Sequence, residues 1–169
     1  MLAFIIFNYI FVVENHQGSD LDSKDKAILA LLQDDARRTT AEIADAVGLS
    51  FSPCARRIKK LEADGVIASY QVTLNRQRIG LNMTFFVNVS LSNHREEAIV
   101  TFENALVEMD EVINGHVISG TYDYLLEVVT RDLPHYEAFM RQLQTLAMVK
   151  DINTNVAIRA VKQGAALKV

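Results

Sequence analysis

Residues 39–61 read TTAEIADAVGLSFSPCARRIKKL, and their pattern predicts two short helices joined by a turn. Thr39 and Glu42 have the spacing of a capping box, in which each side chain accepts a hydrogen bond from the other residue's backbone N–H. Gly48 suits the end of the first helix, because glycine adopts the left-handed conformation without steric cost. Two helices joined in this way are the outline of a helix-turn-helix DNA-binding motif.

The second predicted helix has an apolar face and a basic face. Cys54, Ile58 and Leu61 recur at helical spacing and are expected to face the core. Ser52 and Arg56 then lie on the opposite side, where an arginine can make a bidentate contact with guanine in a major groove. The remaining predicted DNA-binding residues are Thr40 and Ser50 at the helix starts, Pro53 in the first turn, and Arg57, Lys59 and Lys60 for phosphates.

A basic helix face is often only a solvated surface. Here no acidic residue interrupts the basic ones between Ser50 and Leu61, and a capped helix and a turn glycine precede them. Together these features favour contact with double-stranded DNA.

The flanking segments complete the predicted domain over residues 20–74. Asp22 and Asp25 suit the start of a supporting helix with an apolar stripe of Ile28, Leu31 and Leu32. Downstream, residues 66–74 are rich in β-branched residues and alternate in polarity, which predicts two short strands. These strands would form the wing of a winged helix.

Whole-chain properties are compatible with this prediction. The net charge is −4 over 169 residues, so DNA binding would depend on a local basic face and on multivalency. The single cysteine, Cys54, lies on the apolar side of its helix and is expected to be a buried, unreactive residue. The absence of a disulfide framework fits a reducing cytoplasm.

The first thirteen residues are nearly all apolar and differ in character from the rest. This segment is too short to span a membrane alone and lacks the features of a secretory signal. Three interpretations are open for the extension of residues 1–19: a mis-assigned translation start, which we favour, an apolar arm that packs on a partner subunit, or a membrane-touching tail.

Residues 83–162 have the pattern of a second domain, after a linker at 75–82 and before a short tail at 163–169. Phe85, Val87, Val89 and Leu91 alternate with other residues as in a half-buried strand. Predicted helices at 96–109 and 133–146 alternate with strands at 112–118, 124–130 and 149–158. The order βαββαβ predicts an α+β fold with a ferredoxin-like antiparallel sheet. Apolar residues on both strand faces indicate that the uncovered face pairs with another subunit.

Three segments resemble the Lrp/AsnC family of transcription regulators: LDSKD at 21–25, VGLSFSPCARRIKKLEADGVI at 47–67 and SGTYDYLL at 119–126. The resemblance covers about residues 20 to 162. It implies a winged helix-turn-helix followed by a ferredoxin-like domain that binds an effector and forms homodimers, often assembled into octamers. It also implies control of genes of amino-acid metabolism. Family members generally lack an apolar segment such as the one before Asp20.

The family's effector site lies near the loop that joins the two central strands. The resemblance places it here on Ser119, Gly120, Thr121, Tyr122 and Asp123. Independently, glycine lets backbone N–H groups approach a carboxylate, and an aspartate can hold an α-ammonium group, so the loop could meet both poles of an amino acid. The alternative is that these residues form only a hairpin turn.

Catalysis has little support in the sequence, and no metal or cofactor is expected. The four histidines, His16, His94, His116 and His135, are scattered and lack metal-ligand spacing. One enzyme alternative is kept, because siroheme decarboxylases resemble this two-domain plan and could use His116 near a tetrapyrrole. Another alternative is an architectural protein that binds DNA with little sequence preference and responds to no ligand.

Overall fold

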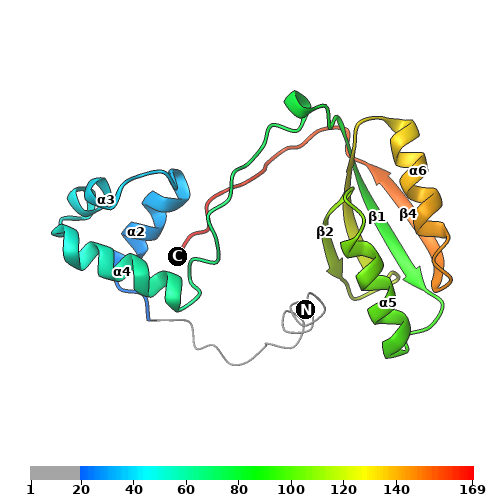
Figure 1. Cartoon of the computed structure of the whole chain (residues 1–169), viewed down its shortest axis with the longest axis horizontal. Helices are drawn as coiled ribbons and strands as arrows, with labels where there is room; N and C mark the ends of the chain where they lie inside the picture. Colours follow the sequence, from blue (N-terminus) through cyan, green and yellow to red (C-terminus); the bar gives the residue numbers. More distant parts are fainter. Residues whose placement is uncertain (1–19) are drawn as a thin grey trace. The chain divides into compact units, whose positions relative to one another are not determined.

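The computed structural model describes residues 20–169, which divide into two compact units (Figure 1). Of the described residues, one unit contains residues 20–72 together with Lys162–Val169, and the other contains Thr73–Val161. The apolar segment 1–13 and its three interpretations lie outside the described residues. Among the helices of residues 20–169, none combines the length and the apolar character needed to cross a membrane.

The described part of the N-terminal unit contains three helices, α2 (Ser23–Asp34), α3 (Thr40–Val47) and α4 (Phe51–Ala63). A capping box starts α2: the Asp22 side chain accepts from the Asp25 backbone, and the Asp25 side chain accepts from the Asp22 backbone. The three helices enclose one apolar core, whose fully buried members include Ile28, Ile43 and Cys54. The predicted three-helix arrangement is therefore confirmed.

The predicted wing strands are absent from the described residues 66–75. Val66 and Ile67 pack on the helical core, but residues 68–74 belong to no helix or strand. Val72 is 85% exposed. An extended segment becomes a strand only when its backbone groups pair with another strand, and the β-branched composition that led to the prediction does not supply one.

The second unit is a four-stranded sheet with two helices, following a 3₁₀ turn at Gln77–Ile79. In chain order its elements are β1 (Met83–Leu91), α5 (Glu96–Val107), β2 (Val112–Val117), β3 (Tyr124–Thr130), α6 (Leu133–Gln144) and β4 (Val149–Val156). All pairings are antiparallel and the strand order is β2-β3-β1-β4, which confirms the ferredoxin-like plan. Because β2 lies at the edge, the loop 119–123 joins an edge strand to an inner one. The two strands are central only in chain order.

The two faces of the sheet differ in character. One face packs under α5 and α6 and buries alternate residues of β1 and β3, with Phe102 and Phe139 contributed by the helices. The register places Phe86, Leu125 and Val129 on the opposite face, beside polar residues such as Asn88 and Asn153. Apolar residues therefore occur on both faces, as predicted, but they are a minority on the open one.

Candidate nucleic-acid interface and effector loop

The turn between α3 and α4 is fixed by local hydrogen bonds. Thr39 Oγ1 accepts from the Glu42 N–H at 3.3 Å, and Glu42 Oε2 accepts from the Thr39 N–H at 2.7 Å. The Thr39 N–H, followed by the Thr39 hydroxyl, which donates to the same Oε2 at 2.8 Å, holds the pKa of the Glu42 carboxyl below its usual range. At the other end, Gly48 has φ +67°, and the Leu49 N–H bonds the Ala44 carbonyl at 2.9 Å. The predicted capping box and glycine turn are both confirmed.

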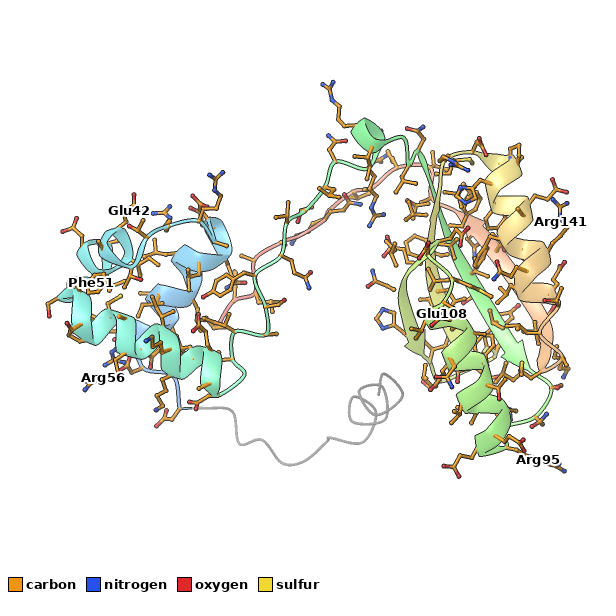
Figure 2. The ribbon with its side chains drawn as sticks, in the orientation of Figure 1. Glu42, Phe51, Arg56, Arg95, Glu108 and Arg141 are labelled. Atoms are coloured by element: carbon orange, nitrogen blue, oxygen red, sulfur yellow. The ribbon has the colours of Figure 1, made fainter. Side chains whose placement is uncertain are left out.

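The two predicted faces of α4 are also confirmed. Cys54 and Leu61 are buried and Ile58 is partly buried against the same core, while Ser52 and Arg56 are exposed (Figure 2). Burial raises the pKa of the Cys54 thiol, which disfavours its reactive thiolate form. Lys59 and Lys60 are exposed as well. The solvent side of α4 therefore presents a hydroxyl, a guanidinium and two ammonium groups.

Arg57 differs from the other basic residues of α4. Its Nη1 lies 2.7 Å from Asp22 Oδ2 and 2.8 Å from Asp25 Oδ1, and its side chain is one-third exposed. Hydrogen bonding to Asp25 and Asp22 raises the pKa of Arg57, so its charge is held by these two carboxylates. The phosphate contact predicted for Arg57 stays a prediction, since both carboxylates are bound by one guanidinium nitrogen, Nη1. Arg57 joins α4 to the start of α2.

The remaining predicted DNA-binding residues lie at helix starts. Thr40 is the first residue of α3 and is partly buried. Ser50 is the N-cap of α4, but its side chain makes no capping hydrogen bond, which leaves its exposed hydroxyl available. Pro53 occupies the first turn of α4 and is partly buried. From α2, the Lys24 ammonium bonds the Val47 carbonyl at the end of α3, so Lys24 supports the turn.

The predicted effector loop is a tight connection between β2 and β3. Ser119, Gly120 and Thr121 are exposed, whereas Tyr122 and Asp123 are partly buried. Gly120 has φ +131°, a conformation that side chains rarely adopt, so glycine is required there. The Ile118 N–H bonds the Asp123 carbonyl at 2.9 Å and closes the loop. The structure thus brings the five predicted residues together in one hairpin connection.

Asp123 anchors this loop to the end of β1. Its Oδ2 accepts from the Leu91 N–H at 2.7 Å, and its Oδ1 lies 2.8 Å from His94 Nε2. The Leu91 N–H, followed by His94, holds the pKa of the Asp123 carboxyl below its usual range. Both carboxylate oxygens therefore have a partner within the chain. Sequence reasoning missed His94, which lies 29 positions from Asp123 and is recognisable only once the loop and β1 are folded together.

Three other side chains of this unit could take part in proton transfer or metal binding. Tyr124 donates to Glu103 Oε1 at 3.0 Å, and burial together with that carboxylate raises the pKa of Tyr124. His135 pairs with Glu111 at 2.9 Å. His116 is exposed on β2, opposite Leu125. Across residues 20–169, no group of three or more His, Cys, Asp or Glu residues is arranged to hold a metal ion.

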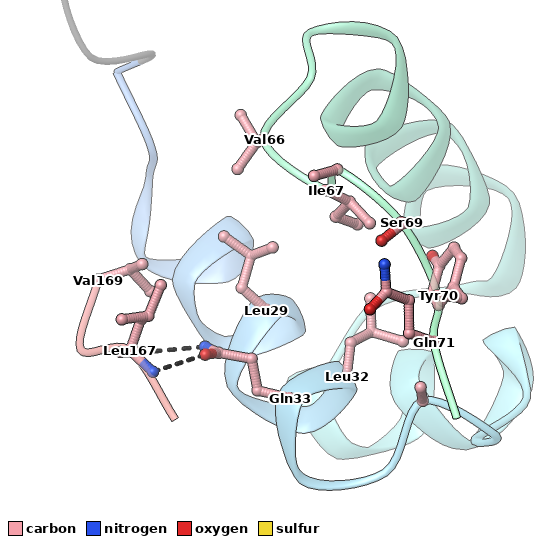
Figure 3. A pocket seen from close by; sticks show the side chains of 12 residues that line it. Leu29, Leu32, Gln33, Val66, Ile67, Ser69, Tyr70, Gln71, Leu167 and Val169 are labelled. Carbon is pink, nitrogen blue, oxygen red and sulfur yellow. Dashed lines mark hydrogen bonds between the residues drawn. The ribbon is translucent and has the colours of Figure 1, made fainter. Parts of the chain in front are cut away.

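The C-terminal tail packs on the N-terminal unit. A pocket of about 390 Å³ lies between α2 and residues 66–71, and its lining includes Leu29 and Leu32 together with Leu167 and Val169 of the tail (Figure 3). The Gln33 side-chain amide donates to the Leu167 carbonyl at 3.1 Å and accepts from the Leu167 N–H at 2.7 Å. The tail is thus held by a two-point hydrogen bond and by apolar contact.

Comparison with known proteins agrees with this geometry. The family model for the Lrp/AsnC ligand-binding domain matches residues 84–167, and one for a winged helix-turn-helix DNA-binding domain matches residues 21–68. The proline dehydrogenase transcriptional activator of Rhizobium radiobacter is 35% identical over 90% of this chain and 98% of its own length.

Two solved structures are also similar. An AsnC family transcriptional regulator from Agrobacterium tumefaciens is 34% identical, with a TM-score of 0.80 over 84% of this chain and 93% of that one. A transcriptional regulator of Neisseria meningitidis, solved in complex with L-Met, is 30% identical, with a TM-score of 0.83 over 87% and 96%. With both domains matched in order and relatives aligned over nearly their whole length, this chain belongs to the Lrp/AsnC family of transcriptional regulators.

Proposed function

We propose that this regulator binds promoter DNA sequence-specifically through α4 and senses an amino acid or a related small molecule through the loop 119–123, controlling genes of amino-acid metabolism. The observation that supports DNA reading is the solvent face of α4. Ser52 and Arg56 are exposed there, and around the helix they are flanked by the exposed Lys59 and Lys60. A helix of this kind fits the major groove, and its N-terminal residues meet base edges there. The protein would act by binding alone, without catalysis.

The exposed basic residues divide into two roles. Arg56 lies on the same side as Ser52, in position for a bidentate contact with guanine. Lys60 lies about two and a half turns from the helix start and suits a phosphate, which contributes affinity without sequence information. The ion-paired Arg57 is assigned to the stability of the domain.

Binding of Arg56→Ala and Lys60→Ala to a selected site and to random DNA tests these roles. Arg56→Ala should reduce the preference for the selected site by about 1–3 kcal/mol. Lys60→Ala should weaken binding to both DNAs alike and reduce the salt dependence. Equal loss of preference in both variants would contradict the assigned roles. A wild-type protein with no preference would favour an architectural role.

Effector sensing by the loop is supported by its conformation and charge. Gly120 has no side chain to shield its backbone groups and adopts a positive φ. Asp123, whose carboxyl has a lowered pKa, supplies a negative charge nearby. The similar regulator from Neisseria meningitidis was solved with L-Met. A thermal-shift screen of the twenty amino acids should show a raised melting temperature with at least one of them, because a ligand that binds only the folded state stabilises it. No shift with any amino acid would contradict this part of the proposal.

We also propose that the chain forms homodimers through the open sheet face and that the dimers assemble into octamers. Phe86 is exposed on this face of β1, and Leu125 of β3 lies diagonal to it, two positions from its partner Glu127. Covering these side chains with a second copy would remove apolar surface from water. Phe86→Asp should shift the sedimentation velocity profile towards monomer, whereas an unchanged profile would exclude this face as the interface.

A further inference from the structure

Phe51 is an exposed aromatic residue at the start of the recognition helix. It is the first residue of α4, and 59% of its surface is exposed. Within residues 20–65 it is the one large apolar side chain in the exposed class. Figure 2 shows it projecting from the α3-facing end of α4. An aromatic ring left in water at this position contributes little burial energy to the fold.

The folded core does not use this ring. The residues that flank the start of α4 and pack inward are Leu49, before the N-cap, and Cys54, in the first turn. These two positions are the ones that normally form a hydrophobic staple at a helix start. Phe51 is not a member of the core cluster. Its replacement should therefore leave the domain folded.

The surroundings of Phe51 are those of a DNA-reading surface. It adjoins the exposed Ser50 and Ser52, and Arg56 lies on the same helix one and a half turns further on. The first turn of α4 contains no acidic residue. When a recognition helix enters a major groove, its N-terminal residues approach the base edges most closely. Phe51, as the first residue of α4, lies at the end of the helix that approaches the bases in this binding mode.

We infer that Phe51 is a specificity-determining residue that contacts the C5-methyl group of a thymine in the major groove. An aromatic hydrocarbon ring makes no conventional hydrogen bond, and the thymine methyl is the apolar group that base pairs present on their major-groove edges. Ser52 and Arg56 would read neighbouring bases by hydrogen bonding, so the two kinds of contact are complementary. This inference rests on the proposed sequence-specific DNA binding.

The test combines selection of a binding site with removal of single methyl groups. The full-length protein is used to enrich binding sites from a random duplex library, and each thymine of the enriched site is then replaced by deoxyuridine, which lacks only the methyl. Each single replacement of the contacted thymine should weaken wild-type binding about fourfold, the value expected for burial of one methyl-sized group. Phe51→Ala should weaken binding to the thymine site and show no further loss with deoxyuridine. Phe51→Leu, which keeps an apolar side chain, should retain sensitivity to the methyl.

The outcomes separate the inference from the function on which it rests. If Phe51→Ala shows the same sensitivity to deoxyuridine as the wild type, the inference is overturned and sequence-specific binding stands. If Phe51→Ala instead changes the sedimentation profile and leaves methyl sensitivity intact, the ring contacts a second copy of the chain and the inference is wrong. If no site is enriched by a protein shown to be folded, the proposed function fails, and the inference fails with it.

Discussion

Replacing Asp123 by alanine should release the loop 119–123 from β1 and lower the stability of the second unit. The variant loses the charge-assisted hydrogen bond that the Leu91 N–H donates to the Asp123 carboxylate. Because Leu91 is only 4% exposed, its N–H is then left without an acceptor. Losing such a bond costs about 1.5–3 kcal/mol. The His94 side chain is 66% exposed, so its contact with Asp123 adds less than about 1 kcal/mol. The expected destabilisation is about 2–3 kcal/mol.

The pH dependence follows from the lowered pKa of Asp123. Because the folded state binds the proton less tightly than the unfolded state, the stabilising contribution is complete above the ordinary pKa of 3.8 and is lost as pH falls through the lower pKa of the folded form. The difference in unfolding free energy between the wild type and Asp123→Ala should therefore shrink as pH falls below 3.8.

Two measurements check this prediction, urea unfolding followed by far-UV circular dichroism and amide exchange of Leu91 followed by NMR. Asp123→Asn keeps an acceptor oxygen and should lose less stability, and Asp110→Ala, which removes an exposed carboxylate, is the matched control. The amino-acid response in the thermal-shift assay should disappear in Asp123→Ala, while DNA binding remains. An unchanged unfolding midpoint together with unchanged protection of Leu91 would refute the anchoring role.

Three further predictions concern stability. Gly48→Ala should lower the free energy of unfolding by about 1–2 kcal/mol, because φ is +67° there. The added Cβ would lie 3.7 Å from Lys24 Nζ, which is ordinary contact, so the backbone conformation alone sets the cost. Gly65→Ala, with φ +70° and nothing within 4 Å of the added Cβ, should lower the free energy of urea unfolding by a similar amount. Phe102→Ala should remove about 3–5 kcal/mol from the second unit, since the ring is 0% exposed, and a loss below 1 kcal/mol would contradict its central place in the core. Deleting residues 167–169 should lower the melting temperature of the N-terminal unit, and Gln33→Ala should reproduce part of the decrease; equal melting temperatures would show that the tail contributes nothing.

Features specified by neighbouring residues were predictable from the sequence. The capping box of Thr39 and Glu42, the glycine turn and the two faces of α4 each depend on residues within one or two helical turns. The alternation of Phe85 to Leu91 similarly indicated which face of β1 is buried. In both cases one periodicity determines both the local structure and the buried surface. The helical core and the βαββαβ order of the second unit can therefore be predicted from the sequence.

The partners of charged side chains were not predictable in the same way. Arg57 meets carboxylates 32 and 35 positions away, and Asp123 meets an imidazole 29 positions away. A helical wheel gives the direction of a side chain but not what another helix places in front of it. The position of Arg57 beside other basic residues therefore predicts a phosphate contact, whereas in the structure two aspartates at the start of α2 bind its guanidinium.

The wing illustrates a different limit, which concerns the backbone. The segment from Val66 to Leu74 has the residue types of a strand, but Val66 and Ile67 form a bend and residues 68–74 belong to no helix or strand. Strand composition describes how side chains fit a pleated surface, whereas a strand also requires a second backbone at hydrogen-bonding distance. An isolated hairpin has too little apolar surface to hold that partner by itself. With Val72 and Leu74 exposed, this segment gains no burial by folding back, so its lack of strand pairing follows from the same physics that makes the buried β1 a strand.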